Sequence, residues 1–107
     1  MLKIKDNVDL KELEKFGFEY YWEIKQNNTS EKYCNGYKVF TEKGYRIGLD
    51  GNAIEVVEER KNANWFFPNE EREIYVFETD YDMGVSNEIL NIIYDLISAG
   101  LVEKVGE

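Results

Sequence analysis

The sequence has 107 residues, 43% of them hydrophobic, which is the length and apolar content of one small domain spanning residues 1–107. Acidic residues outnumber basic ones by 22 to 13, and the net charge of -9 disfavours direct contact with nucleic acid, which requires lysines and arginines to replace phosphate counterions. Because the sequence contains no histidine, it excludes Ser-His-Asp triads, Cys-His pairs and histidine metal sites.

Cysteine usage and hydropathy favour a cytoplasmic protein. The one cysteine, Cys34, cannot form an internal disulfide, which is typical of a reducing compartment. No apolar run approaches the roughly 20 residues of a membrane span, and no signal-peptide core stands near the N-terminus. We therefore expect a cytoplasmic protein that has no membrane partner.

The negative charge is confined to the second half of the sequence. Residues 1–53 contain equal numbers of acidic and basic residues, so the whole net charge of -9 falls in residues 54–107. It is densest in residues 54–82. Such an asymmetry indicates either an interaction surface or a solvated face that keeps a small protein soluble.

A short helix is predicted over residues 9–16. Asp9 is a favourable N-cap, and Glu12 completes a capping box. Gly17 supplies a left-handed stop, after which Phe18 can fold back on the helix.

Five strands are predicted between this helix and the C-terminal part of the chain, at residues 18–25, 37–41, 45–49, 53–58 and 74–77. In the first strand, Tyr20, Trp22 and Ile24 are predicted to face the core together with Phe18, which leaves Tyr21 pointing outward.

Two further predictions concern how these strands are arranged. Glu42, Lys43 and Gly44 are predicted to form a tight turn between the second and third strands. Residues 74–77 are apolar on both faces, which predicts a central strand of the sheet.

A second helix is predicted over residues 87–99, capped by Ser86 and closed by Gly100. Its apolar residues fill an arc of roughly 200°, wider than a surface helix needs. The arc indicates either a helix sunk into the sheet or one that also meets a second subunit, so a homodimer is an open alternative. Residues 101–105 are predicted to add an edge strand.

These elements predict an α+β fold in one domain. It consists of a short N-terminal helix, about five mainly antiparallel strands in one sheet, and a C-terminal helix packed on the sheet.

The candidates for chemistry in the sequence are weak. Asp80 and Asp82 begin a segment that resembles a calcium-binding loop, but Val85 and Asn91 stand where that loop requires glycine and glutamate. Cys34 has no histidine to activate it, and the sequence has no phosphate-binding or nucleophile-elbow motif. We therefore expect a protein that is not an enzyme and that binds no metal or cofactor.

Binding is the favoured class of function. Trp65, Phe66 and Phe67 form a bulky apolar group inside a polar connection with acidic residues after it. Large aromatic residues with a polar rim are typical of protein–protein hot spots, although the same three residues would also suit a loop folded into the core.

The acidic residues predict a more specific interaction. Glu78, Asp80 and Asp82 recur at every second position, which in an extended chain places like charges roughly 6.6 Å apart on one side. Such a row can imitate a nucleic-acid backbone and occupy a basic groove. The predicted partner-binding residues are Glu55, Glu58, Glu59, Trp65, Phe66, Phe67, Glu70, Glu71, Glu73, Glu78, Asp80 and Asp82.

Two stretches, KIKDNVDLKELEKFGF at residues 3–18 and IYDLISAGLVEKV at residues 93–105, resemble small phage and prophage proteins of low-GC Gram-positive bacteria. The resemblance covers about a quarter of the chain and does not include its acidic middle. It implies an origin in a mobile element and carries over no catalytic residues. Proteins of this kind include inhibitors of host defence, anti-CRISPR proteins among them, several of which are nucleic-acid mimics.

These observations together predict a non-enzymatic acidic protein-binding module in the host bacterial cytoplasm. Its expected partner is a protein with a basic surface, such as a nucleic-acid-binding defence enzyme that it inhibits. The alternative is a phage structural, assembly or regulatory protein that self-associates through the C-terminal helix.

Overall fold

The computed structural model describes the chain except for residues 27–38, 50, 64–66, 68, 80–83 and 107. Within the described residues the elements are β1 (Leu2–Ile4), the 3-10 helix η1 (Leu10–Phe16), β2 (Glu19–Gln26), β3 (Val39–Leu49), β4 (Asn52–Lys61), β5 (Tyr75–Glu78), α1 (Asn87–Ser98) and β6 (Val102–Lys104).

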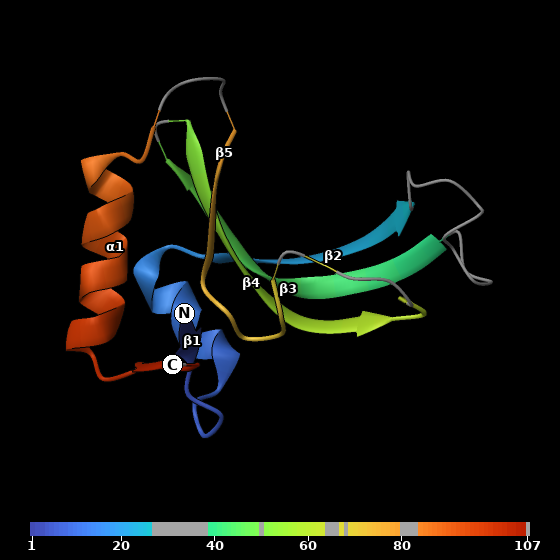
Figure 1. The fold of residues 1–107 in the computed structure, drawn as a ribbon, viewed down its shortest axis with the longest axis horizontal. Helices are drawn as coiled ribbons and strands as arrows, with labels where there is room; N and C mark the ends of the chain where they lie inside the picture. The colour runs from blue at the N-terminus through green and yellow to red at the C-terminus, as the bar shows by residue number, and fades with distance from the viewer. Residues whose placement is uncertain (27–38, 50, 64–66, 68, 80–83, 107) are drawn as a thin grey trace.

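The described strands form two antiparallel sheets (Figure 1). Strands β2, β3, β4 and β5 lie side by side in that order in a four-stranded sheet, and β1 pairs with β6 in a two-stranded sheet. The α+β class with mainly antiparallel strands is therefore confirmed. The prediction of a single sheet was wrong, because the tail pairs with the N-terminal segment and not with the edge of the larger sheet.

The capped N-terminal helix was predicted correctly in place, and its hydrogen bonding is of the 3-10 type. The Asp9 carboxylate accepts from the backbone N–H of Lys11 at 3.0 Å, as an N-cap should. Gly17 has φ +95°, and the N–H of Phe18 returns to the carbonyl of Leu13. Glu12 does not complete the capping box but pairs with Lys15 at 2.7 Å.

Strand β3 is continuous where a turn was predicted. Glu42, Lys43 and Gly44 lie within it and pair with both neighbouring strands. A bulge between Lys43 and Gly44 leaves Glu58 of β4 as the extra residue. At Gly44 a Cβ atom would stand 2.3 Å from the carbonyl oxygen of Val56, so glycine here permits a close approach of two strands and does not mark a turn.

The four-stranded sheet has two different faces. The core face carries Tyr45, Ile54 and Val56, which pack with residues of η1 and α1 in the hydrophobic core. The polar face carries Tyr21, Glu42 and Glu55, because directly opposite residues of paired strands share a face. Figure 1 shows β2, β3 and β4 continuing well beyond the part of the sheet that the helices cover.

Strand β2 places its side chains on alternate faces as predicted, but the predicted burial was wrong beyond its first residues. Phe18 is buried as expected, but Tyr20, Trp22 and Ile24 lie on the uncovered part of the core face and are exposed. Tyr21, predicted to point outward, is only 8% exposed because it packs into the polar face. The physical reason is that the helices end before they reach Trp22.

Helix α1 begins and ends as predicted. The Ser86 hydroxyl accepts from the N–H of Ile89 at 3.2 Å, and the N–H of Leu101 returns to the carbonyl of Leu96. Its wide apolar arc divides into two parts. Ile89 and Leu96 are fully buried in the core, whereas other apolar residues on the helix remain exposed.

Strand β5 and the two termini complete the fold. β5 lies at an edge of the larger sheet, so the prediction of a central strand was wrong. Arg72, which precedes it, has φ +67° and donates hydrogen bonds to the carbonyls of Ile4, Lys5 and Val8. This arginine therefore joins the larger sheet to the N-terminal segment. Among the described residues, no helix is both long and apolar enough to cross a membrane.

Gly44→Ala tests the close approach of β3 and β4. A Cβ atom would meet backbone atoms of Val56 and Val57, so the strands must separate, and we expect the free energy of unfolding to fall by about 2 kcal/mol. Gly48→Ala is the matched control, because its nearest contact is at 3.6 Å, and it should change stability by less than about 0.5 kcal/mol. Urea denaturation followed by circular dichroism measures both, and equal effects would contradict the steric argument.

Candidate functional site

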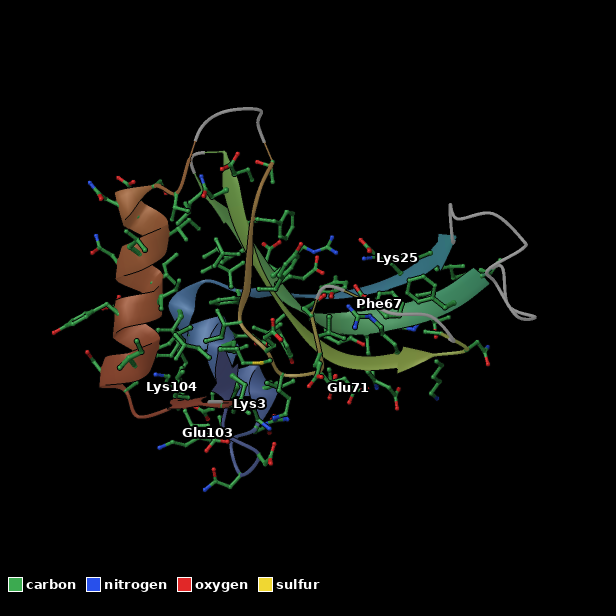
Figure 2. All side chains as sticks on the ribbon, viewed as in Figure 1. Lys3, Lys25, Phe67, Glu71, Glu103 and Lys104 are labelled. Carbon is green, nitrogen blue, oxygen red and sulfur yellow. The ribbon has the colours of Figure 1, made fainter. Side chains whose placement is uncertain are left out.

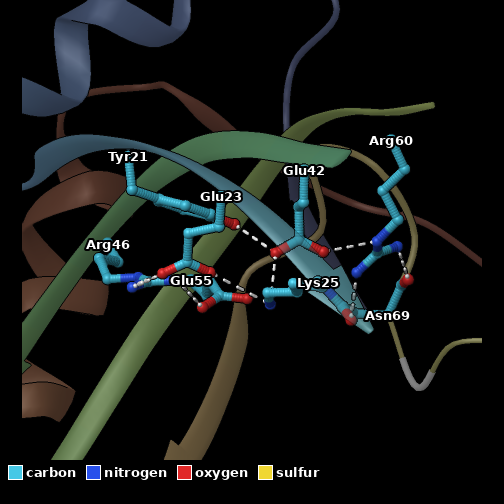
Figure 3. Close-up of polar contacts among 8 residues, drawn as sticks. All are labelled: Tyr21, Glu23, Lys25, Glu42, Arg46, Glu55, Arg60 and Asn69. Atoms are coloured by element: carbon cyan, nitrogen blue, oxygen red, sulfur yellow. Dashed lines mark hydrogen bonds and ion pairs between the residues drawn. The ribbon is translucent and has the colours of Figure 1, made fainter. Parts of the chain in front are cut away.

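The polar face is organised around one buried carboxylate (Figure 3). Glu42 of β3 is 1% exposed. It accepts hydrogen bonds from Lys25 Nζ at 2.8 Å, from Arg60 Nε at 2.7 Å and from Tyr21 Oη at 2.9 Å. These three partners come from the two strands that flank β3, so the buried charge is compensated from both sides.

A second ion cluster lies beside the first one on the same face. Arg46 donates from one guanidinium nitrogen to Glu23 at 2.7 Å and from another to Glu55 at 3.0 Å. Its guanidinium carbon also lies 3.8 Å from the centre of the Tyr21 ring, in cation–π geometry. Tyr21 therefore connects the two clusters through its ring and its hydroxyl.

The connection between β4 and β5 packs on the far end of this face. Arg60 donates to the backbone oxygen of Asn69 at 2.9 Å and to its side-chain oxygen at 3.1 Å. The Phe67 ring lies under the Arg60 guanidinium at 3.9 Å and meets Phe40 edge-on at 5.1 Å. Phe67 is thus partly buried on the polar face and does not join the hydrophobic core. Trp65 and Phe66 lie outside the described residues.

The network fixes the charge of its members. Burial raises the pKa of Glu42, but the hydrogen bonds from Lys25, Arg60 and Tyr21 outweigh this effect and hold the pKa below its usual value. The hydrogen bond from Arg46 likewise lowers the pKa of Glu23. Burial, together with the charge of Glu42, raises the pKa of Tyr21. These pKa values lie away from neutrality, where a general acid or base needs its pKa to be.

A hollow of about 620 Å³ opens on the polar face next to Arg46. Gly48 of β3 and Ala53 of β4 lie directly opposite each other in this hollow. Because both residues are small, they leave space above the sheet. The rings of Tyr75 and Phe77 stack at 5.4 Å along β5 and form one wall. Since Arg46 and Glu55 already bind each other, the hollow suits an apolar side chain more than a charged ligand.

Among the described residues, no group of three or more aspartate, glutamate or cysteine side chains is placed to hold a metal ion. Asp80 and Asp82, the two residues of the calcium-loop resemblance, lie outside that part of the chain.

The predicted acidic residues that the structure describes do not form one row, and Asp80 and Asp82 lie outside the described residues. Glu55 is 8% exposed and ion-paired with Arg46, so its assignment to an exposed acidic surface was wrong. Its burial follows from its place in the register, opposite Arg46. Glu59 lies between Lys43 at 3.7 Å and Lys61 at 3.8 Å, which neutralise it locally.

The remaining predicted acids are distributed over separate parts of the surface. Glu70 and Glu71 are exposed in the connection before β5, where Figure 2 labels Glu71. Glu73 is partly buried and bridges to Lys3 of β1 through the backbone. Glu78 is exposed at the opposite end of β5, and Glu58 is exposed at the bulge of β4.

Two apolar stripes are exposed. Sequence reasoning missed the exposure of the first, on β2, and gave contact with a second subunit as one alternative for the apolar arc of α1, which carries the second. The β2 stripe consists of Tyr20, Trp22 and Ile24, of which Trp22 is 55% exposed and Ile24 is 64% exposed. The α1 stripe consists of the exposed residues Leu90, Tyr94 and Ile97, with Tyr94 at 67%. The alternation of β2 and the wide arc of α1 both contained these residues, but neither pattern shows which side is covered.

Comparisons with known proteins add no further information on the site. The chain matches no protein-family model, and comparisons with curated proteins and with solved structures also give no match.

Glu42→Gln tests whether the buried carboxylate supports the fold. Removing its charge leaves Arg60 and Lys25 without their shared partner, so we expect the free energy of unfolding at neutral pH to fall by about 3 kcal/mol. Glu59→Gln removes a more exposed carboxylate and should cost less than about 0.5 kcal/mol.

The same pair of variants predicts a pH dependence. Because the pKa of Glu42 is lower in the folded chain than in the unfolded one, its contribution is fully present above the ordinary pKa of 4.5 and is lost as the pH falls below it. Urea denaturation between neutral and acidic pH should show a shallower loss of stability in Glu42→Gln than in wild type. Parallel pH profiles would contradict this assignment.

Proposed function

We propose that this chain is a non-enzymatic protein-binding module that docks through the outer side of α1. The observation that carries the proposal is the α1 stripe. Leu90, Tyr94 and Ile97 are spaced at i, i+4 and i+7, so they share one side of the helix, and all three are exposed. This is the spacing with which an amphipathic helix inserts its apolar side into a groove of another protein.

The charges around the α1 stripe indicate the chemistry of the partner. The ionised residues on α1 are Glu88 and Asp95, both exposed, and the last turn carries no basic residue. Glu78 is exposed at the end of β5 that precedes the helix. At 100° per residue, Glu88 and Asp95 lie about 100° or more around the helix from Tyr94, so a partner with a basic surface beside its apolar groove is the electrostatic complement. Figures 1 and 2 show α1 at the outside of the molecule, with one side free for such a partner.

This arrangement favours an unlike partner over a second copy of α1. A helix-to-helix homodimer would bring together two helices that each carry Glu88 and Asp95 and no lysine or arginine, which adds like-charge repulsion between the copies. The structural or assembly role based on self-association of this helix is therefore the less favoured alternative.

The target class that we propose is a host nucleic-acid-binding defence protein. Such a protein has a basic surface for phosphate groups, which matches the acidic residues of α1. The resemblance to phage and prophage proteins supports an inhibitor of this kind. Full imitation of a nucleic-acid backbone has less support, since Glu55 is buried and Glu59 is paired with lysines.

Tyr94→Asp tests the docking surface. The aromatic anchor is lost and a charge enters the apolar stripe, so binding to the partner captured from host lysate should weaken by more than about tenfold. Val39→Asp is the control, because it makes the same change to aspartate at an exposed apolar residue of β3 that belongs to neither stripe, and it should leave this binding unchanged. Titration of the captured partner by biolayer interferometry measures both affinities. Equal binding of wild type and Tyr94→Asp would refute the proposal.

Competition with nucleic acid tests the target class. If the partner holds nucleic acid on the same basic surface, an oligonucleotide that it binds should displace the wild-type chain, and the affinity should decline steeply between low and high salt. Binding that persists under saturating oligonucleotide would contradict the inhibitor role while leaving the α1 surface in place.

A further inference from the structure

Strand β2 is an uncovered edge with an exposed apolar stripe. It lies at one end of the strand order in the larger sheet, so one side of its backbone has no partner strand among the described residues. Tyr20, Trp22 and Ile24 extend along it on the core face, beyond the helices. Natural edge strands are usually shortened, charged on the exposed stripe or interrupted by proline, because an open apolar edge is a template for pairing with another strand.

The order of residues in β2 indicates what this edge pairs with. We propose that β2 pairs in antiparallel orientation with β2 of a second copy of this chain, with Trp22 on the twofold axis. In this register Tyr20 lies opposite Ile24 of the second copy and Trp22 opposite Trp22, so the two apolar stripes join. On the polar face, Glu19 lies opposite Lys25 of the second copy, and the symmetry forms this pair twice.

Neighbouring registers are disfavoured by charge. A shift that places Glu23 on the axis sets Glu23 against itself, and a shift that places Tyr21 on the axis sets Glu19 against Glu23. A shift that places the axis between two residues is disfavoured as well, because it puts apolar residues of one copy opposite charged residues of the other. Of the registers compared, the one centred on Trp22 places apolar residues opposite apolar residues and Glu19 opposite Lys25.

The two charged residues are available for this contact. Among the described residues, Glu19 takes part in no ion pair and is exposed. Lys25 donates to Glu42 at 2.8 Å, yet a third of its side chain is exposed and its ammonium group has three protons. It can therefore hold Glu42 within its own chain and Glu19 of the second copy at the same time.

This dimer leaves the proposed α1 surface free. Helix α1 packs on β4, β6 and η1, and Figure 1 shows it on the opposite side of the molecule from the C-terminal end of β2. The two four-stranded sheets become one continuous sheet, with an α1 helix on each half. One dimer therefore presents two copies of the α1 stripe, which raises the apparent affinity for a partner with two matching grooves. The inference rests on β2 alone and does not require the function proposed for α1.

Glu19→Lys tests the charge pairing. It places two lysines opposite each other at both ends of the interface, and we expect the dimer dissociation constant measured by sedimentation velocity to rise about tenfold or more. Glu14→Lys makes the same charge change at an exposed position of η1 and should leave the constant unchanged. The proposal would be overturned if wild type sediments as a monomer at all concentrations, or if the two variants have equal dimer dissociation constants. It would also be overturned if Tyr94→Asp dissociates the dimer and Trp22→Asp does not.

Cysteine cross-linking tests the register. In a Cys34→Ser background, Tyr20→Cys and Ile24→Cys are prepared separately, mixed and oxidised. Directly opposite residues lie within disulfide reach, so the mixture should form a disulfide between the two unlike chains, whereas each variant alone should remain largely unlinked. Cross-linking of either variant with itself at the rate of the mixture would overturn the register, even if a dimer forms.

Discussion

The carboxylate of Glu42 is the constraint on which the rest of this fold depends. It lies on the middle of three long strands, and a buried carboxylate is tolerated only with partners close at hand. Those partners fix the side-chain orientation of Tyr21 and Lys25 on β2, and Arg60 on β4 extends the network to Asn69 in the following connection. One charge thus sets the orientation of both neighbouring strands and holds a long segment against the sheet.

The exposed stripe on β2 follows from this constraint. Because Tyr21, Glu23 and Lys25 must face the network, the alternate residues Tyr20, Trp22 and Ile24 must face the other way. The helices cover that side over Tyr45 and Val56 but not over Trp22. An ionic cluster on one face of the sheet therefore accounts for an apolar surface on the other, and this surface is the one that we assign to a second copy of the chain.

The parts of the fold that the sequence predicted correctly are those that depend on adjacent residues. Asp9, Gly17 and Ser86 act within one turn of their helices, so their roles can be read locally. The burial of Tyr21 could not be read in this way, because it requires Glu42 and Arg46, which lie on another strand. For the same reason, the burial of Glu55 was not predicted. A charge count along the chain includes Glu55, whose charge is cancelled by an arginine that only the register brings near.

The pairing of β1 with β6 has a consequence for how the chain acquires its fold during synthesis. Ile4 is fully buried in the core, yet its strand pairs with residues near the other end of the chain. While the ribosome is still adding α1, the partner of β1 does not exist, and Ile4 and Leu13 lack the cover that Ile89 and Leu96 later provide. The nascent chain can form its long hairpin early, because β3 and β4 are joined by a short turn. The core, by contrast, closes only when β6 has emerged, so the order of events runs from the sheet to the helices and ends with the pairing of β1 and β6.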